Sequence, residues 1–599
     1  MLRPLSAPAR IVLSFATPGL RRWQPTCYSQ LINFQPFAGR QFHPGEVKGK
    51  RVVTSRQTTD SASAKRFKRT ESAQPIPQLA STVVTNYWDD VMKFSREPGS
   101  YTLGHPTDSG GETPSDSMAD HANLSVQDDH DIRRLLRRTI STRREQGDIL
   151  PSLLARQCCE FYEGLDLAGR ANFLRILGRD FDVNREAVAA AAHKYLDARS
   201  AGKGDKGFMR TEEILRQSLQ PLYEKFFERI NQLPGGMQFL VNMRANVLEI
   251  LGRNGNDPYL RGLSDSLKTQ LQGWFGIGFL DLERITWNSP ATVLEKIVRY
   301  EAVHAVPTWQ ALKQRLGPGR LCYSFFHRGM PQEPLTFVQV ALVREIAEDV
   351  QVILNDPSPE VPDPTVAIFY SISSSQRGLS GVDLGNFLIK RVVKEIQQVL
   401  PSIETFCTLS PIPRFRQWLE TRLNGGNVPS GDSLLLGEEV EALRSLMGKG
   451  AADDDILILK NILAGNSWYK DPNVSQTLKP ILLRLCARYL LFEKKRSFAL
   501  DPVCNFHIRN GACMHRLNWM GDTSEKGLSQ SYGIMVNYNY VLPEIETNNQ
   551  LYLLDGTIAV MEPVDQTLEW AVSTAVHGGK DFARLRLVKS VGDVQMAKL

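Results

Sequence analysis

Two polar residues in the second half of the chain, His507 and Ser410, have neighbours that would suit work on a bound substrate. His507 lies between Phe506 and Ile508, in a stretch of amides, aromatics and small residues. A histidine in such a setting can hand a proton to a substrate, although a single histidine is also common in a core or on a surface. Ser410 precedes Pro-Ile-Pro, and proline restricts the residue before it to extended conformations, so its hydroxyl should be held in place. The alternative for Ser410 is an ordinary turn at a strand end.

A strand, a glycine-containing loop and a helix are expected just before Ser410. The apolar run at 367–373 is typical of a buried strand. Three glycines follow, and their backbone could approach phosphate oxygens at the start of a helix; they are Gly378, Gly381 and Gly385. The helix is predicted from apolar residues at helical spacing, namely Phe387, Leu388, Val392, Ile396 and Val399. The glycine spacing matches neither the dinucleotide nor the Walker pattern, so a plain strand-to-helix turn is the alternative.

Taken in order, these segments resemble the malonyl-CoA decarboxylase family. The resemblance is carried by motifs at 378–385, 387–395, 409–413 (Leu-Ser-Pro-Ile-Pro), 505–507 (Asn-Phe-His), 510–512 and 537–540, with a weaker likeness at 300–304. It implies an α+β fold, in which a helical N-terminal oligomerisation domain precedes a mixed α/β catalytic domain of the GNAT acyltransferase type. The implied reaction converts malonyl-CoA to acetyl-CoA and carbon dioxide, without a metal or an organic cofactor.

The resemblance also assigns site residues. The family's catalytic serine and histidine fall on Ser410 and His507, and a further active-site tyrosine falls on Tyr540. The substrate-binding residues besides these three form one loop: Ser380, Gly381, Val382, Asp383, Leu384, Gly385 and Asn386. The family typically has glutamate where this chain has Asp383, whose carboxylate sits one methylene closer to the backbone. If that carboxylate orients Ser410 or His507, the shorter arm requires a water or a small backbone shift.

The implied chemistry suits these residue types. Loss of carbon dioxide leaves an enolate, which needs fixed hydrogen-bond donors and then a proton on carbon. We expect His507 to donate that proton, Ser410 to bind the malonyl carboxylate or relay the proton, and Tyr540 and Asp383 to set their positions. An acyl-serine mechanism is the competing assignment for Ser410. Two other functions stay open, a CoA-dependent acyltransferase of the same fold and a catalytically inactive relative that only binds acyl-CoA or scaffolds an oligomer.

Length and composition limit the possible domain organisation of the chain. Its 599 residues, 42% hydrophobic and 23% charged, are ordinary for an enzyme with several domains. A net charge of +6 without basic stripes argues against nucleic acid as a partner, and no apolar run is long enough to span a membrane. We expect a leader and linker at 1–127, a helical domain that forms a homo-oligomer at 128–297, and a catalytic domain at 298–599 with a helical insertion at 424–500.

Both ends of the chain carry candidate targeting signals. The first 40 residues contain five arginines and no Asp or Glu, as in a mitochondrial transit peptide. The chain closes with Ala597-Lys598-Leu599, one substitution from the peroxisomal Ser-Lys-Leu signal. We therefore expect a mitochondrial matrix protein with peroxisomal and cytosolic pools, and a peroxisomal import receptor as a partner.

A zinc site is the alternative for the region around His507. Two cysteines and a second histidine lie nearby, at Cys504, Cys513 and His515. Their spacing matches no familiar zinc motif, and the family pattern does not call for them. No metal is therefore predicted.

Overall fold

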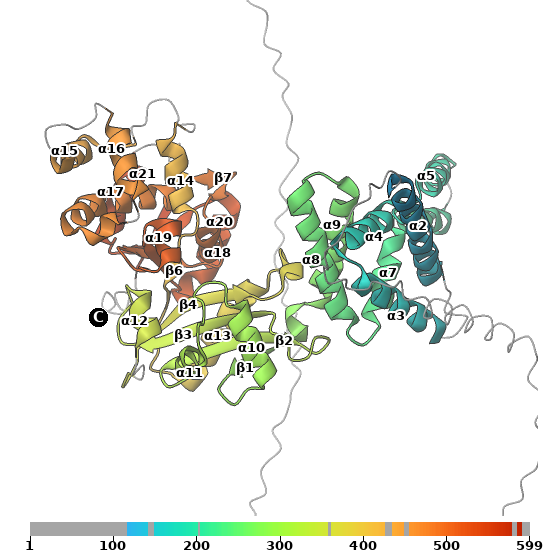
Figure 1. Cartoon of the computed structure of the whole chain (residues 1–599), viewed down its shortest axis with the longest axis horizontal. Helices are drawn as coiled ribbons and strands as arrows, with labels where there is room; N and C mark the ends of the chain where they lie inside the picture. Colours follow the sequence, from blue (N-terminus) through green and yellow to red (C-terminus); the bar gives the residue numbers. More distant parts are fainter. Residues whose placement is uncertain are drawn as a thin grey trace, which may run out of the picture. The chain divides into compact units, whose positions relative to one another are not determined.

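The computed structural model describes residues 117–141, 149–201, 204–356, 361–425, 434–447, 454–465, 467–577 and 584–589 (Figure 1). The leader with its five arginines and the tripeptide Ala597-Lys598-Leu599 lie outside the described residues. The first described helix begins at Ser117, within the range 1–127 that was expected to be leader and linker.

The N-terminal part of the described chain is helical, as predicted (Figure 1). Its helices are α2 (Ser117–Ser141), α3 (Ile149–Gly164), α4 (Leu167–Asp180), α5 (Arg185–Ser200), α6 (Asp205–Ser218), α7 (Leu222–Asn231), α8 (Gly236–Asn254) and α9 (Pro258–Trp274). Local sequence explains several starts, because a side-chain oxygen that accepts from the first free N–H groups stabilises a helix end. Asp257 does this for α9, with Pro258 at the first helical position.

An apolar face of α8 lies in the core of this region. Phe239, Met243 and Val247 are buried, as their spacing predicts, and Ile250 is partly buried. Phe239 packs edge-on against Tyr162 of α3, with ring centroids 5.5 Å apart. We refer to α2–α9 as the helical region.

In the described part of the chain, a ten-stranded sheet follows the helical region. Its strands are β1 (Leu280–Ile285), β2 (Arg320–His327), β3 (Thr336–Val343), β4 (Val366–Ser374), β5 (Thr405–Thr408), β6 (Ser410–Pro411), β9 (Cys513–Asn518), β10 (Met535–Asn539), β11 (Ile558–Glu562) and β12 (Leu585–Lys589). They lie in the order β1-β2-β3-β4-β5-β10-β9-β11-β12, with β6 paired to β10. A separate hairpin joins β7 (Lys494–Lys495) to β8 (Phe498–Ala499).

The pairing changes direction in the middle of the sheet. Strands β1 to β4 form an antiparallel meander, whereas β4 and β5 are parallel. A parallel pair needs a crossover connection, and the chain supplies it as a short 3-10 turn, η3 (Arg377–Leu379), followed by α13 (Leu384–Val399). This β4–η3–α13–β5 unit carries the predicted strand, loop and helix, and it positions Ser410 directly after β5.

Helices cover the sheet and complete the domain. Between β1 and β4 lie the helices α10 (Ala291–Tyr300), α11 (Trp309–Arg315) and α12 (Val350–Asn355). After β6 come α14 (Phe415–Leu423), α15 (Gly437–Met447), α16 (Asp455–Ala464), α17 (Pro472–Leu491), α18 (Pro502–Arg509), α19 (Glu525–Ser531), α20 (Ile545–Asp555) and α21 (Gln566–His577). Helices α15 to α17 lie in the range 424–500 of the expected insertion.

The fold class predicted from the sequence is confirmed, since a helical N-terminal region precedes a mixed α/β domain. The first strand was not anticipated: β1 lies inside the range 128–297 that was assigned to helix, and it pairs with β2 through all six of its residues. In the part of the chain that the structure describes, no helix combines the length and apolar character needed to cross a bilayer.

Candidate functional site

Three elements bring Ser410, His507 and Tyr540 together. Ser410 opens β6 and pairs with Val536 of β10. His507 lies on α18, whose start is capped by the buried Asp501 carboxylate, which accepts from the N–H groups of Val503 and Cys504 at 2.9 Å each. Tyr540 directly follows β10, and its N–H donates to the Phe406 carbonyl of β5 at 2.8 Å. The sheet and one capped helix therefore fix the three side chains relative to one another.

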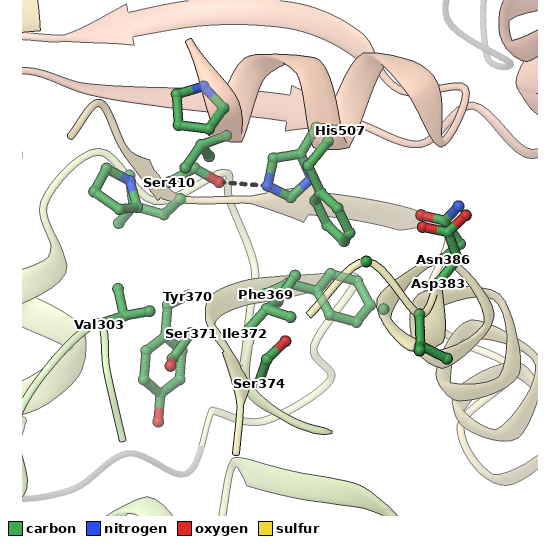
Figure 2. A pocket seen from close by; sticks show the side chains of 18 residues that line it. Val303, Phe369, Tyr370, Ser371, Ile372, Ser374, Asp383, Asn386, Ser410 and His507 are labelled. Carbon is green, nitrogen blue, oxygen red and sulfur yellow. Dashed lines mark hydrogen bonds between the residues drawn. The ribbon is translucent and has the colours of Figure 1, made fainter. Parts of the chain in front are cut away.

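A continuous line of hydrogen bonds joins these side chains. Ser410 Oγ lies 3.1 Å from His507 Nε2, as Figure 2 shows. The other ring nitrogen, Nδ1, lies 2.9 Å from the Tyr540 hydroxyl. The Ser410 hydroxyl in turn donates to Thr408 Oγ1 at 2.9 Å. The predicted catalytic pair is thus within hydrogen-bonding distance, with Tyr540 behind the histidine and Thr408 behind the serine.

Burial sets the protonation states along this line. His507 is 3% exposed and stacks on Tyr538, with ring centroids 4.7 Å apart. Desolvation lowers the pKa of His507 to about 3, because burial disfavours the charged ring. Burial also raises the pKa of Tyr540, which keeps its phenol protonated. The phenol can then donate to Nδ1 of a neutral ring, and that ring carries its proton on Nε2, facing Ser410.

The Ser410–His507 pair faces a pocket of about 340 Å³. Its lining includes Gly381, Val382, Asp383, Gly385 and Asn386 of the expected substrate loop. Figure 2 shows Asp383 and Asn386 close together on one side and the Ser410–His507 pair on the other.

Two of the expected loop residues are directed elsewhere. Leu384 is 6% exposed and packs in the main hydrophobic core, and the Ser380 carbonyl accepts from Arg244 of α8 at 2.9 Å. Neither lines the pocket. The loop therefore divides into residues that face the pocket and residues that anchor it.

Asp383 does not orient the catalytic pair in this structure. Its carboxylate is 59% exposed, and Oδ2 lies 3.9 Å from Arg509 Nη2 at the end of α18. The contact pairs Asp383 with Arg509 rather than with Ser410 or His507. The shorter side chain at this position therefore leaves the hydrogen-bonded line intact.

The glycines before α13 and in its first turn serve close packing. A Cβ at Gly378 would overlap the backbone carbonyl of Val241 on α8, and a Cβ at Gly385 would lie 2.9 Å from a ring carbon of Phe506. Gly381 has φ of +79°, in the left-handed region that favours glycine. Gly378 is thus needed for contact with the helical region, whereas the sequence suggested a ligand contact.

The sequence did not predict two residues of the candidate site. Thr408 is fully buried, and its Oγ1 accepts from the Tyr538 N–H at 3.1 Å as well as from Ser410. Arg244 is buried and donates to carbonyls of the loop, at Gly378 and Ser380. The position of Thr408, two residues before Ser410 on an expected strand, could have indicated a shared face. Arg244 lies far away in the sequence and gave no such signal.

The alternative zinc assignment finds no support among the residues that the structure describes. Within them, no group of three or more His, Cys, Asp and Glu side chains is arranged to hold a metal ion. Cys504 instead donates to the Leu490 carbonyl, and Cys513 accepts from Asn548.

Comparison with known proteins agrees with this geometry. The family model described as the malonyl-CoA decarboxylase N-terminal domain matches residues 181–275, and the C-terminal domain model matches 278–577. Curated relatives named mitochondrial malonyl-CoA decarboxylase come from Anser anser anser and Mus musculus. The Anser anser anser protein is 42% identical over 429 residues, which cover 70% of this chain and 84% of that protein. The Mus musculus protein is 40% identical over 442 residues, which cover 72% of this chain and 89% of that protein.

Solved structures give the same result. The chain is similar to the crystal structure of malonyl-CoA decarboxylase from Rhodopseudomonas palustris, with a TM-score of 0.63 and 35% identity over 74% of this chain and 99% of that one. The Agrobacterium vitis structure of the same name matches with a TM-score of 0.63 and 32% identity, covering 73% and 99%. The helical region, the mixed sheet and the buried Ser–His pair define a class of α/β enzyme with an added helical domain. Within that class, the chain belongs to the malonyl-CoA decarboxylase family.

Proposed function

We propose that this chain decarboxylates malonyl-CoA to acetyl-CoA and carbon dioxide in the pocket beside Ser410 and His507. The single observation that carries the proposal is the line Tyr540–His507–Ser410, which ends at the pocket wall with a serine hydroxyl. A decarboxylase needs a held proton donor where the enolate carbon forms, and this line supplies one.

The proposed roles follow the hydrogen bonds. Ser410 binds the malonyl carboxylate and relays the proton that His507 supplies. Tyr540 orients the imidazole from Nδ1, while Thr408 orients the serine. Both are positioning residues because they act through His507 and Ser410. The loop residues Gly381, Val382, Asp383, Gly385 and Asn386 form the opposite wall, and Ser380 and Leu384 hold the loop in place.

The chemical step can be written with its protons. The negative malonyl carboxylate beside Ser410 raises the pKa of His507, so that the ring takes up a proton. The bond from the carboxyl carbon to the methylene carbon breaks, carbon dioxide leaves, and the electron pair stays on the thioester as an enolate. The proton then moves from His507 through the Ser410 hydroxyl to the enolate carbon. This yields acetyl-CoA and returns the ring to the neutral state that burial favours.

The proposal is tested by supplying the purified chain with malonyl-CoA alone. We expect carbon dioxide and acetyl-CoA in equal amounts. A CoA-dependent acyltransferase would give no carbon dioxide without an acceptor, and an acyl-serine mechanism would leave a mass increase on the peptide that contains Ser410. The comparisons do not favour the transferase, since the relatives are named decarboxylases. Absence of carbon dioxide would refute the proposal.

A homo-oligomer through the helical region is also proposed. Apolar side chains stay exposed on α5 and α6 and just after them, namely Leu196 at 53%, Met209 at 67%, Ile214 at 42% and Leu219 at 55%. Exposed apolar area on neighbouring helices is typical of a contact between subunits. Light scattering should give a multiple of 67.3 kDa, and Met209→Glu should lower that mass. A monomer at micromolar concentration would refute the proposal.

We propose residence in the mitochondrial matrix, with peroxisomal and cytosolic pools. The relatives are named mitochondrial, and Ala597-Lys598-Leu599 would be read by a peroxisomal import receptor. Imaging a chain tagged within the linker, with and without residues 1–91 and the last three residues, tests both signals. If the leaderless chain stays cytosolic while the tripeptide is intact, the peroxisomal pool is refuted.

A further inference from the structure

The substrate loop contacts the helical region as well as the mixed α/β domain to which it belongs. The turn η3 lies against α8. Arg244 of α8 is 3% exposed, and it donates to the carbonyls of Gly378 and Ser380 in the loop and to that of Ser264 in α9 at 3.2 Å. A buried guanidinium must satisfy its N–H groups, so these bonds hold the loop against α8 and α9.

A lysine of α9 lies directly over this anchored loop. A Cβ at Gly381 would lie 3.0 Å from Lys268 Cε and 3.1 Å from Nζ. One helical turn later, Gln272 Nε2 donates to the Gly381 carbonyl at 3.4 Å. The helical region therefore brings an ammonium group to a backbone position that lines the pocket.

Among the residues that the structure describes, Lys268 has no anionic partner. It is partly buried, and no described carboxylate forms an ion pair with it. The nearest acidic residue of the loop, Asp383, is turned to Arg509 instead. A cation that a fold holds beside a pocket without a protein counter-ion is suited to an anionic part of the ligand.

The arrangement of residues along the pocket indicates which part of the ligand would lie next to Lys268. The reacting carbon belongs beside Ser410 and His507, and Figure 2 shows that the loop residues Asp383 and Asn386 lie on the other side. Malonyl-CoA carries its thioester at one end of the pantetheine arm and its phosphates at the other. With the thioester at Ser410, the phosphates leave along the loop.

We propose that Lys268 binds a phosphate group of the CoA part of the substrate, so that the helical region completes the substrate site. This inference rests on the proposed function, since it takes malonyl-CoA as the substrate. An ammonium acts on phosphate as a point charge with three donors. The contact is made equally before and during the reaction, so it lowers KM without a comparable effect on kcat.

The test compares malonyl-CoA with malonylpantetheine, which lacks the phosphates together with the adenosine that they carry. The quantity measured is the ratio of kcat/KM for malonyl-CoA to kcat/KM for malonylpantetheine, followed as carbon dioxide release. Lys268→Ala should lower this ratio about tenfold, the worth of one partly screened charge-assisted hydrogen bond. Lys268→Arg should keep most of it. The matched control is Arg261→Ala, an exposed cation on the same helix whose guanidinium donates to the Gly255 carbonyl.

Each outcome decides the question. A lower ratio for Lys268→Ala alone supports the inference. An unchanged ratio overturns it, and so does an equal loss on both substrates, because Lys268 would then support the loop rather than bind phosphate. If the unaltered chain releases no carbon dioxide from either substrate, the proposed function itself fails, which is a separate result.

Discussion

Replacement of Thr408 by valine tests whether Thr408 positions the hydroxyl of Ser410. The change keeps the shape of the side chain and replaces its hydroxyl with a methyl group. That hydroxyl is fully buried and accepts two hydrogen bonds, from Ser410 Oγ at 2.9 Å and from the Tyr538 N–H at 3.1 Å. Valine leaves the Tyr538 N–H unsatisfied, which costs about 1–3 kcal/mol of unfolding free energy.

The effect on activity has a different origin. Without Thr408 Oγ1 the Ser410 hydroxyl can rotate away from its observed direction, and a misplacement near 1 Å can cost on the order of a hundredfold in rate. We therefore expect Thr408→Val to lower kcat by about 10- to 100-fold with a small change in KM. Carbon dioxide release measures the rate, and the urea midpoint measures stability.

Thr408→Ser is the matched control, because it keeps the hydroxyl and loses one methyl group. It should retain most of kcat. If Thr408→Val lowers the urea midpoint but leaves kcat unchanged, then Thr408 supports the sheet and does not position Ser410. That result would refute the reasoning.

Three further changes probe the surroundings of the site. Tyr540→Phe removes the donor to His507 Nδ1 and should lower kcat at least tenfold at nearly constant KM; an unaltered kcat would show that Tyr540 does not orient the ring. The pKa of His507 is about 3 in the folded chain and 6.5 ordinarily. Between these two pH values the unfolded chain binds one proton more than the folded chain, so the free energy of unfolding falls as the pH falls. From pH 6.5 to 4 this costs about 3 kcal/mol, and the urea midpoint of His507→Gln should fall less than that of the unaltered chain; parallel curves would contradict the burial argument. Gly378→Ala should destabilise the chain and raise KM because its Cβ meets the Val241 carbonyl, whereas Gly262→Ala on α9, with its nearest atom 3.8 Å away, should not; equal KM values would show that the loop does not need this contact.

Local patterns predicted the elements that carry the site. The apolar run at 367–373 is β4, and the helical spacing after Gly385 is α13. Leu388, Val392 and Ile396 are buried as expected, while Phe387 and Val399 at its margins are 43% and 58% exposed. The spacing of apolar residues indicates which face of a helix is apolar, and residues at the edge of that face can be either buried or exposed.

Contacts between distant segments were beyond the reach of such patterns. Gly378 and Arg244 meet across 134 residues of sequence, so nothing local could indicate that the loop is held from α8. For the same reason the role of Gly378 was misread as a ligand contact. The strand β1 was missed because its alternation is short: Leu280 and Leu282 alternate with acidic residues, and Arg284 then breaks the pattern.

The direction of the Asp383 side chain also could not be read from the sequence. A carboxylate in the substrate loop suggested a partner among the catalytic residues, but the loop starts α13 with Asp383 exposed and next to Arg509. Motifs in the sequence predicted Ser410 and His507 as the catalytic pair. Their 3.1 Å contact required the strand β6 and the capped helix α18 to be placed together by the whole sheet.

The most direct test of the central claim is a double-mutant cycle on Ser410 and His507, with carbon dioxide release from malonyl-CoA as the readout. Since the two side chains share one hydrogen bond and one proton path, Ser410→Ala and His507→Ala should each lower kcat by roughly a hundredfold to ten-thousandfold. The double variant should lose far less than the product of the two losses. Near-normal kcat in either single variant, or losses that multiply, would contradict the account.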